Sequence, residues 1–143
     1  VLSMQSLAWA NDHKTTEKQQ VDAAFTSWRM ALSSGRAENL VKLYDKDAIL
    51  LATLAAQPLT TQEERMQYFT ALTAKPKLSA TVTEEHVRML DEDDAVVSGL
   101  YTFSFEEDGK KVKIPARFSF VYEKENGNWM IVEHHSSKVP EEQ

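Results

Sequence analysis

Apolar residues in the first half of the chain follow the period of a helix. Between residues 15 and 32 they lie on one helical face, at Val21, Ala24, Phe25, Trp28 and Leu32. The same spacing predicts a second, shorter helix over 37–44, and a third helix that Thr60 or Thr61 caps and Pro76 ends. Between these last two helices, residues 45–47 (Asp-Lys-Asp) predict a turn, and the continuous apolar run 48–52 predicts a short buried strand.

After Pro76 the period changes to two, which is typical of strands. Four strands are predicted, over 78–90, 95–106, 111–124 and 128–138. Asp108-Gly109 and Asn126-Gly127 separate the last three, and both dipeptides favour tight hairpin turns. Helices followed by an antiparallel meander indicate an α+β domain with the helices on one face of the sheet.

Length and composition narrow the class of protein. A chain of 143 residues is enough for one domain, which we place at 15–140, after a separate N-terminal segment at 1–14. The absence of cysteine excludes disulfide scaffolds and thiolate metal sites. The net charge of −6, without a dense basic patch, argues against nucleic acid as a partner, and no apolar stretch of the body is long enough to span a membrane.

The N-terminal segment bears on where the protein is found. Residues 1–10 are uncharged and end in Ala8-Trp9-Ala10, a pattern that signal peptidase prefers. One interpretation is the remnant of an export signal and a periplasmic or secreted protein. The alternative is an ordinary N-terminus with a chance motif and a cytoplasmic protein.

The order of elements and the last two strands carry a resemblance. The chain has a helix with a tryptophan, a short helix ending in Leu43-Tyr44, a third helix, and a meander ending in Gly127-Asn128-Trp129-Met130-Ile131-Val132. This order resembles the nuclear transport factor 2-like (cystatin-like) superfamily. The strings 117–122 (RFSFVY) and 134–137 (HHSS) are similar to bacterial SnoaL-like relatives of the calcium/calmodulin-dependent protein kinase II association domain. The resemblance implies a cone-shaped fold, a pocket between sheet and helices, and assembly through the sheet.

One departure from that family limits what the resemblance implies. The kinase hub lines its pocket with arginines, and an approximate alignment places Tyr101, Phe120 and Ser136 at three of those positions. Arg117 is displaced from them. Affinity for the same acidic ligands is therefore not transferred to this chain.

Strand parity predicts which residues share a face of the sheet. One parity is aromatic and should face the helices: Tyr101, Phe103, Phe105, Phe118, Phe120, Tyr122, Met130, Val132, His134 and Ser136. The other parity is mixed and suits an interface with a second subunit, for which we single out Trp129, Ile131, Glu133 and His135.

The inner face, with helix residues that point toward it, predicts a pocket for an unidentified small molecule. The expected pocket residues are Trp28, Tyr44, Tyr68, His86, Tyr101, Phe103, Arg117, Phe120, Tyr122, His134 and Ser136. The alternative is a filled core in which Tyr101 and His134 satisfy each other. Arg117 belongs to the pocket only if a β-bulge near Pro115 turns it inward.

Two further functions depend on His134. Adjacent histidines on a strand point to opposite faces, so His134 and His135 do not form a metal site, and we expect neither a metal nor a cofactor. A lyase or isomerase would use His134 as the base and Tyr101 as the donor to an oxyanion. The primary expectation is a homodimer, or a higher ring, that binds a small molecule, and the enzyme is the alternative.

Overall fold

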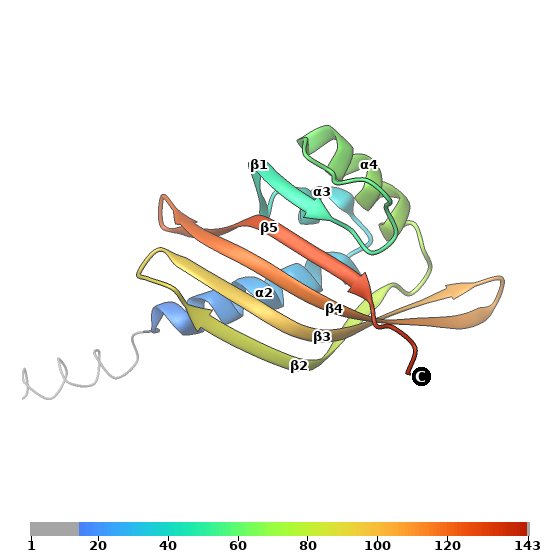
Figure 1. The fold of residues 1–143 in the computed structure, drawn as a ribbon. Helices are drawn as coiled ribbons and strands as arrows, with labels where there is room; N and C mark the ends of the chain where they lie inside the picture. The colour runs from blue at the N-terminus through green and yellow to red at the C-terminus, as the bar shows by residue number, and fades with distance from the viewer. Residues whose placement is uncertain (1–14, 143) are drawn as a thin grey trace, which may run out of the picture.

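The computed structural model describes residues 15–142, so the predicted N-terminal segment 1–14 lies outside the described residues (Figure 1). Within the described residues, three helices and five strands follow one another. They are α2 (Glu17–Ser33), α3 (Ala37–Val41), β1 (Tyr44–Leu51), α4 (Gln62–Thr73), β2 (Ser79–Met89), β3 (Asp94–Glu107), β4 (Lys110–Glu125) and β5 (Asn128–Lys138).

The strands form one sheet in the order β1-β5-β4-β3-β2. The four strands of the meander pair antiparallel, and β1 adds to the edge of β5 in parallel. The helices lie on one side of this curved sheet, with α2 running under it (Figure 1). The predicted α+β class is confirmed. No helix within residues 15–142 is long and apolar enough to cross a membrane.

Both long helices begin with a capping box, and the box of α4 settles the choice between Thr60 and Thr61 that the sequence left open. Thr16 accepts a hydrogen bond from the Gln19 backbone amide, and Gln19 bonds back to Thr16. Thr61 and Glu64 form the same reciprocal pair at the start of α4. Each box satisfies two amides that a helix start leaves without a partner.

The main difference from the predicted elements lies around β1. The short helix ends at Val41 instead of residue 44, and residues 45–47, expected to be a turn, belong to β1. The register of β1 against β5 shifts between Tyr44 and Ile49. The buried guanidinium of Arg65 donates hydrogen bonds to three backbone carbonyls of this shifted stretch, those of Asp45, Lys46 and Ala48. A side chain from α4 thus replaces strand pairing that the irregular register does not supply.

Two further irregularities set which side chains face the helices. In β2, Thr83 is an extra residue between the pairs of Val82 and Glu84. The backbone approaches so closely there that a Cβ at Gly99 would collide with the Glu84 carbonyl oxygen. In β5, Val132 is the extra residue, between the pairs that Ile131 and Glu133 make with β4. Each bulge inverts the side-chain alternation along its strand.

Candidate functional site

A buried chain of hydrogen bonds centred on His134 lies between β5 and the helices. The Oη of Tyr44 is 2.7 Å from His134 Nδ1, and the Oη of Tyr101 is 3.2 Å from His134 Nε2. Trp28 Nε1 donates to Tyr44 Oη at 3.0 Å, and Tyr101 Oη donates to Ser136 Oγ at 2.6 Å. All five side chains are at most 4% exposed. The chain therefore joins α2, β1, β3 and β5 through polar groups inside an aromatic core.

The donors fix the tautomer of His134. Tyr101 gives its one proton to Ser136, so its oxygen accepts from the Nε2–H of His134. His134 Nδ1 then carries no proton and accepts from the hydroxyl of Tyr44, whose oxygen accepts from the indole N–H of Trp28. In this network of hydrogen bonds, every donated hydrogen points in the direction that leads from Trp28 to Ser136. The neutral Nε2–H tautomer is the form that satisfies each of these groups.

Burial keeps the side chains of this hydrogen-bonded network neutral. Burial, with a smaller contribution from the neighbouring His135, lowers the pKa of His134 to about 3. Burial likewise raises the pKa of Tyr44 and of Tyr101 well above the ordinary value for a phenol. Protonation of His134 would place an N–H at Nδ1, where Tyr44 donates, so one of the two protons would lose its acceptor.

Aromatic rings fill most of the space around this chain. The ring centroids of Phe120 and Trp28 lie 3.7 Å and 5.3 Å from that of the His134 imidazole. The remaining cavity, which Thr53 and Tyr68 also line, has a volume of about 10 Å³. A cavity of that size is near the minimum that holds one water molecule. The closed arrangement is the filled core that the sequence left open as the alternative, and it has no room for a larger guest.

Most of the predicted pocket residues meet at this place. The cavity or the imidazole is contacted by Trp28, Tyr44, Tyr68, Tyr101, Phe103, Phe120, His134 and Ser136. Tyr122 is equally buried and shares the inner face, but it lines a separate groove beside α2.

His86 and Arg117 were predicted to line the pocket, and that prediction is wrong. Both side chains are exposed on the outer face of the sheet. His86 Nε2 lies 2.6 Å from a carboxylate oxygen of Glu84, and Arg117 Nη2 donates to Ser137 Oγ at 3.4 Å. The register of β3 against β4 is continuous through Pro115, so no bulge turns Arg117 inward.

The first half of β5 has the opposite orientation from the one predicted. Ile131, expected at an interface, is 1% exposed in the core, and Trp129 packs partly buried against the same core. The cause is the bulge at Val132. The alternation of residues along a single sequence does not reveal such a bulge. Glu133 and His135, beyond the bulge, are exposed on the outer face as predicted.

Two polar contacts near this place were not predicted. Thr53 forms a close hydroxyl contact with Ser136 from the segment after β1, where no periodicity marks it. Arg65 is fully buried. It occupies an apolar position of the α4 pattern, with Phe69 and Leu72, and a charge at such a position is the signal that could have identified it.

Metal coordination needs several ligands that converge. Among residues 15–142, no three His, Asp or Glu side chains lie close enough together to hold a metal ion.

A family model and two solved structures place the chain in the same family. The model of the calcium/calmodulin-dependent protein kinase II association domain matches residues 17–140. A crystal structure from Xanthomonas campestris, provisionally named as such an association domain, is 39% identical with a TM-score of 0.81, and the match covers 85% of this chain and 87% of that one. The kinase II hub homology domain of Chlamydomonas reinhardtii is 26% identical with a TM-score of 0.75, covering 87% and 100%.

More distant structures share the fold alone. A protein from Streptomyces avermitilis, provisionally named a dehydratase of the nuclear transport factor 2-like family, is 19% identical with a TM-score of 0.77, and the match covers 86% of this chain and 97% of that one. No curated protein matches the chain significantly. The cone-shaped fold implied by the resemblance is confirmed, and the chain belongs to the calcium/calmodulin-dependent protein kinase II association domain family.

Proposed function

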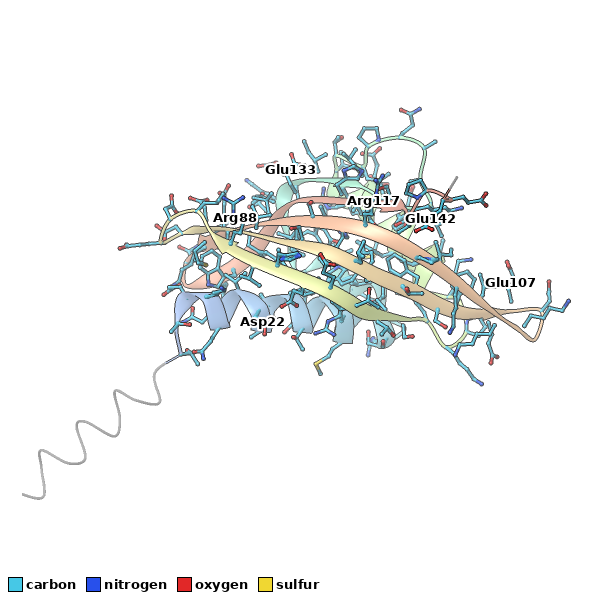
Figure 2. All side chains as sticks on the ribbon, turned by 60° about the horizontal axis from the view of Figure 1, so that its bottom comes forward. Asp22, Arg88, Glu107, Arg117, Glu133 and Glu142 are labelled. Atoms are coloured by element: carbon cyan, nitrogen blue, oxygen red, sulfur yellow. The ribbon has the colours of Figure 1, made fainter. Side chains whose placement is uncertain are left out.

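We propose that this chain is a self-association module that forms a homodimer through the outer face of its sheet. The observation that carries the proposal is the composition of that face, which is complementary to itself. The description of the family as an association domain supports it. Figure 2 shows Arg88, Arg117 and Glu133 on the side of the sheet that faces away from α2. Asp22, which belongs to α2, lies on the opposite side.

The register aligns the outward side chains of β2, β3, β4 and β5 in three rows across the sheet. The first row is Glu84, Leu100, Arg117 and Ser137; the second is His86, Ser98, Ser119 and His135; the third is Arg88, Val96, Val121 and Glu133. The third row has a cation at one end, an anion at the other and two valines between them.

Two copies of this face fit together about a two-fold axis that runs along the strands in the plane of the interface. Such an axis places β2 of one copy over β5 of the other. Arg88 then lies over Glu133 of its partner, and this pair occurs twice in the dimer. In the same arrangement Val96 lies over Val121, so the row pairs opposite charges at its ends and apolar groups in its centre.

Apolar surface on this face supplies part of the driving force. Leu100 in the middle of the sheet is 36% exposed, and Leu51 on the neighbouring β1 is 37% exposed. A second copy on this face would bury both leucines, and the removal of their apolar surface from water favours association.

The packing around His134 argues against catalysis there, and so favours self-association over the enzyme alternative. A lyase or isomerase at His134 would need a substrate beside a free nitrogen of the imidazole. Both nitrogens of His134 are bonded to tyrosines, and the cavity there is about 10 Å³. Binding of a small molecule at that position would first require the rings around it to move.

A charge swap tests the proposal directly. Arg88→Glu turns both attractive pairs of the dimer into repulsive ones, as does Glu133→Arg, so each should raise the dimer dissociation constant by about tenfold or more. The double variant Arg88→Glu/Glu133→Arg restores opposite charges and should recover association. Sedimentation velocity over a range of protein concentrations measures all three.

The control is Arg36→Glu, which changes the same charge at an exposed position before α3 and should leave association unchanged. A wild-type chain that stays monomeric at micromolar concentration would refute the proposal. A double variant that associates no better than the single variants would show that Arg88 and Glu133 do not face each other.

A further inference from the structure

Two exposed histidines lie at opposite ends of one row on the outer face of the sheet. His86 is on β2 and His135 is on β5, and the small side chains of Ser98 and Ser119 lie between them in the register. Three strand spacings separate the two histidines within one chain, which is about 14 Å. The two imidazoles of a single chain therefore do not reach one ion together.

His86 has a second group beside it that can act as a metal ligand. Its Nε2 lies 2.6 Å from a carboxylate oxygen of Glu84, and both side chains are more than half exposed. A zinc ion that binds a nitrogen and an oxygen tetrahedrally, with bonds of about 2 Å, holds those two atoms about 3.3 Å apart. A small opening of the Glu84–His86 pair thus admits the ion in place of the hydrogen that now lies between the two atoms.

In one chain, however, this pair is an incomplete metal site. Among the residues that the structure describes, 15–142, no third His, Asp or Glu side chain converges on Glu84 and His86. Zinc sites in proteins commonly have three or four protein ligands. The missing ligand must therefore come from a second molecule.

The dimer proposed above supplies that ligand, so this inference rests on the proposed self-association. The two-fold axis that places Arg88 over the partner's Glu133 also places His86 over the partner's His135, because both rows cross the strands in the same order. Facing sheets lie about 10 Å apart. Two imidazoles that share one zinc ion, with bonds of about 2 Å each, span a gap of that size.

The charges around this position are compatible with a cation. The row of His86 and His135 contains no Lys or Arg. Arg88, in the neighbouring row, lies over the partner's Glu133 in the same dimer, so its charge is compensated there. The carboxylate of Glu84 forms no ion pair with a Lys or Arg side chain of residues 15–142. It therefore remains available to a metal ion.

We propose that the dimer binds two zinc ions, each held by Glu84 and His86 of one subunit and by the partner's His135. Imidazole nitrogens and a carboxylate oxygen are ligands that zinc prefers, and water takes the fourth position. The expectation of no metal considered only one chain, whereas this site needs two. Because the complete site exists only in the dimer, zinc should strengthen self-association.

The response of association to zinc tests this site in the full chain, prepared without a histidine tag. Sedimentation velocity in EDTA measures the metal-free dimer, and the same series in zinc chloride should give a dimer dissociation constant lower by about tenfold or more. Magnesium chloride should have no such effect, because magnesium prefers oxygen ligands. His13→Ala, which removes a histidine from the N-terminal segment, is the control and should keep the full response to zinc.

Two variants determine whether the ligands come from different subunits. His86→Ala and His135→Ala should each associate in EDTA as wild type does, and each should lose the response to zinc. A mixture of the two variants should regain a response. The mixed dimer unites His86 of one chain with His135 of the other, and so contains one complete site.

The results separate a failure of this site from a failure of the dimer. A wild-type dimer in EDTA that zinc does not strengthen would overturn the zinc site and leave the proposed self-association standing. A mixture that responds to zinc no better than either variant alone would overturn the sharing of an ion between His86 and the partner's His135. A wild-type chain that is monomeric in EDTA and in zinc would refute the dimer and the site together.

Discussion

The two faces of the sheet use the same kinds of residue for opposite purposes, and two adjacent histidines show this best. His134 points inward, is 3% exposed and has both nitrogens bonded to tyrosines. His135 points outward and is exposed in a row with Ser119 of β4. One position contributes to the stability of the fold, and the other belongs to the surface that we propose meets a second subunit.

Hydrogen-bond partners within the chain, rather than burial or residue type, distinguish a structural polar group from one that is available to bind another molecule. On the inner face the polar groups around His134 satisfy one another, so they leave little for a ligand to bind. On the outer face, Arg88 and Glu133 are exposed and form no ion pair with another side chain of residues 15–142, so another copy can reach their charges. Changes to the inner face should therefore alter stability without altering association, and changes to the outer face should do the reverse.

The largest effect is expected from His134→Ala. It removes a buried ring and leaves the hydroxyl of Tyr44 and the oxygen of Tyr101 without their partner. The free energy of unfolding should fall by about 3–5 kcal/mol, as measured by urea denaturation. His135→Ala is the matched control and should change it by about 0.5 kcal/mol or less. Equal losses for the two variants would contradict the division between faces.

Acid should destabilise the folded chain through the same residue. The pKa of His134 is about 3 in the folded chain, against 6.5 for an ordinary histidine, so the unfolded chain binds more protons between these values. Stability is therefore lost as the pH falls below about 6.5, by up to about 1.4 kcal/mol per pH unit.

The comparison that isolates this effect is His134→Asn, which removes the titrating group. Urea denaturation at pH 6, 5 and 4 gives the free energy of unfolding as a function of pH. The slope of this dependence should be smaller in the variant than in wild type, by the equivalent of about one bound proton. Identical slopes would mean that His134 is not held neutral by the fold.

A smaller effect separates the two buried tyrosines of the inner face. Tyr101→Phe leaves the Nε2–H of His134 and the Oγ of Ser136 with one partner fewer, and it should cost about 1–3 kcal/mol in thermal or urea unfolding. Tyr122→Phe removes a hydroxyl that has no hydrogen-bond partner among residues 15–142, so it should lower the free energy of unfolding by about 0.5 kcal/mol or less, or raise it. A larger loss for Tyr122→Phe than for Tyr101→Phe would reverse this interpretation.

The smallest effect concerns Glu85, on β2 beside Asp22 of α2. Partial burial, the hydrogen bond to Asp22 and its charge raise the pKa of Glu85 to about 7 from 4.5. The folded chain therefore binds more protons in that interval, and its stability falls as the pH rises from about 4.5 through 7. This dependence is opposite in sign to that of His134.

The free energy of unfolding of Glu85→Gln should equal that of wild type near pH 5. At pH 8 it should be higher than that of wild type by about 1 kcal/mol, once solvent screening is allowed for. Glu107→Gln, at an exposed hairpin end, is the control and should show no such gain. A variant that is less stable than wild type at pH 8 would count against the shared proton between Glu85 and Asp22.

Much of the architecture could be predicted because it depends on local periodicity. The two periods gave the helices and the four meander strands to within two residues at most ends, and equal parity brought Tyr101, Phe120 and His134 together correctly. Regular alternation holds through β3 and β4, whose register has no break. Residues on these strands could be assigned to a face without any structure.

Predictions failed where the backbone departs from regular pairing. The bulge at Val132 inverted Trp129 and Ile131, and the shifted register of β1 converted an expected turn into strand, with Arg65 supplying the missing hydrogen bonds. Neither event has a local signal, because each is decided by contacts between segments that are distant in sequence. The volume of the interior cavity depends on packing among several elements, and it too could not be obtained from alternation.

The most direct test of the outer face as an interface uses the absence of cysteine from the chain. Single-cysteine variants Ser98→Cys and Ser119→Cys place one thiol each on the middle row of that face, and Ser34→Cys places one at the end of α2 on the helix side. When the first two variants are mixed and treated with a short bismaleimide, we expect a cross-linked dimer to form rapidly between them, and Ser34→Cys to cross-link only slowly. Equal rates for the mixture and for Ser34→Cys would contradict the account.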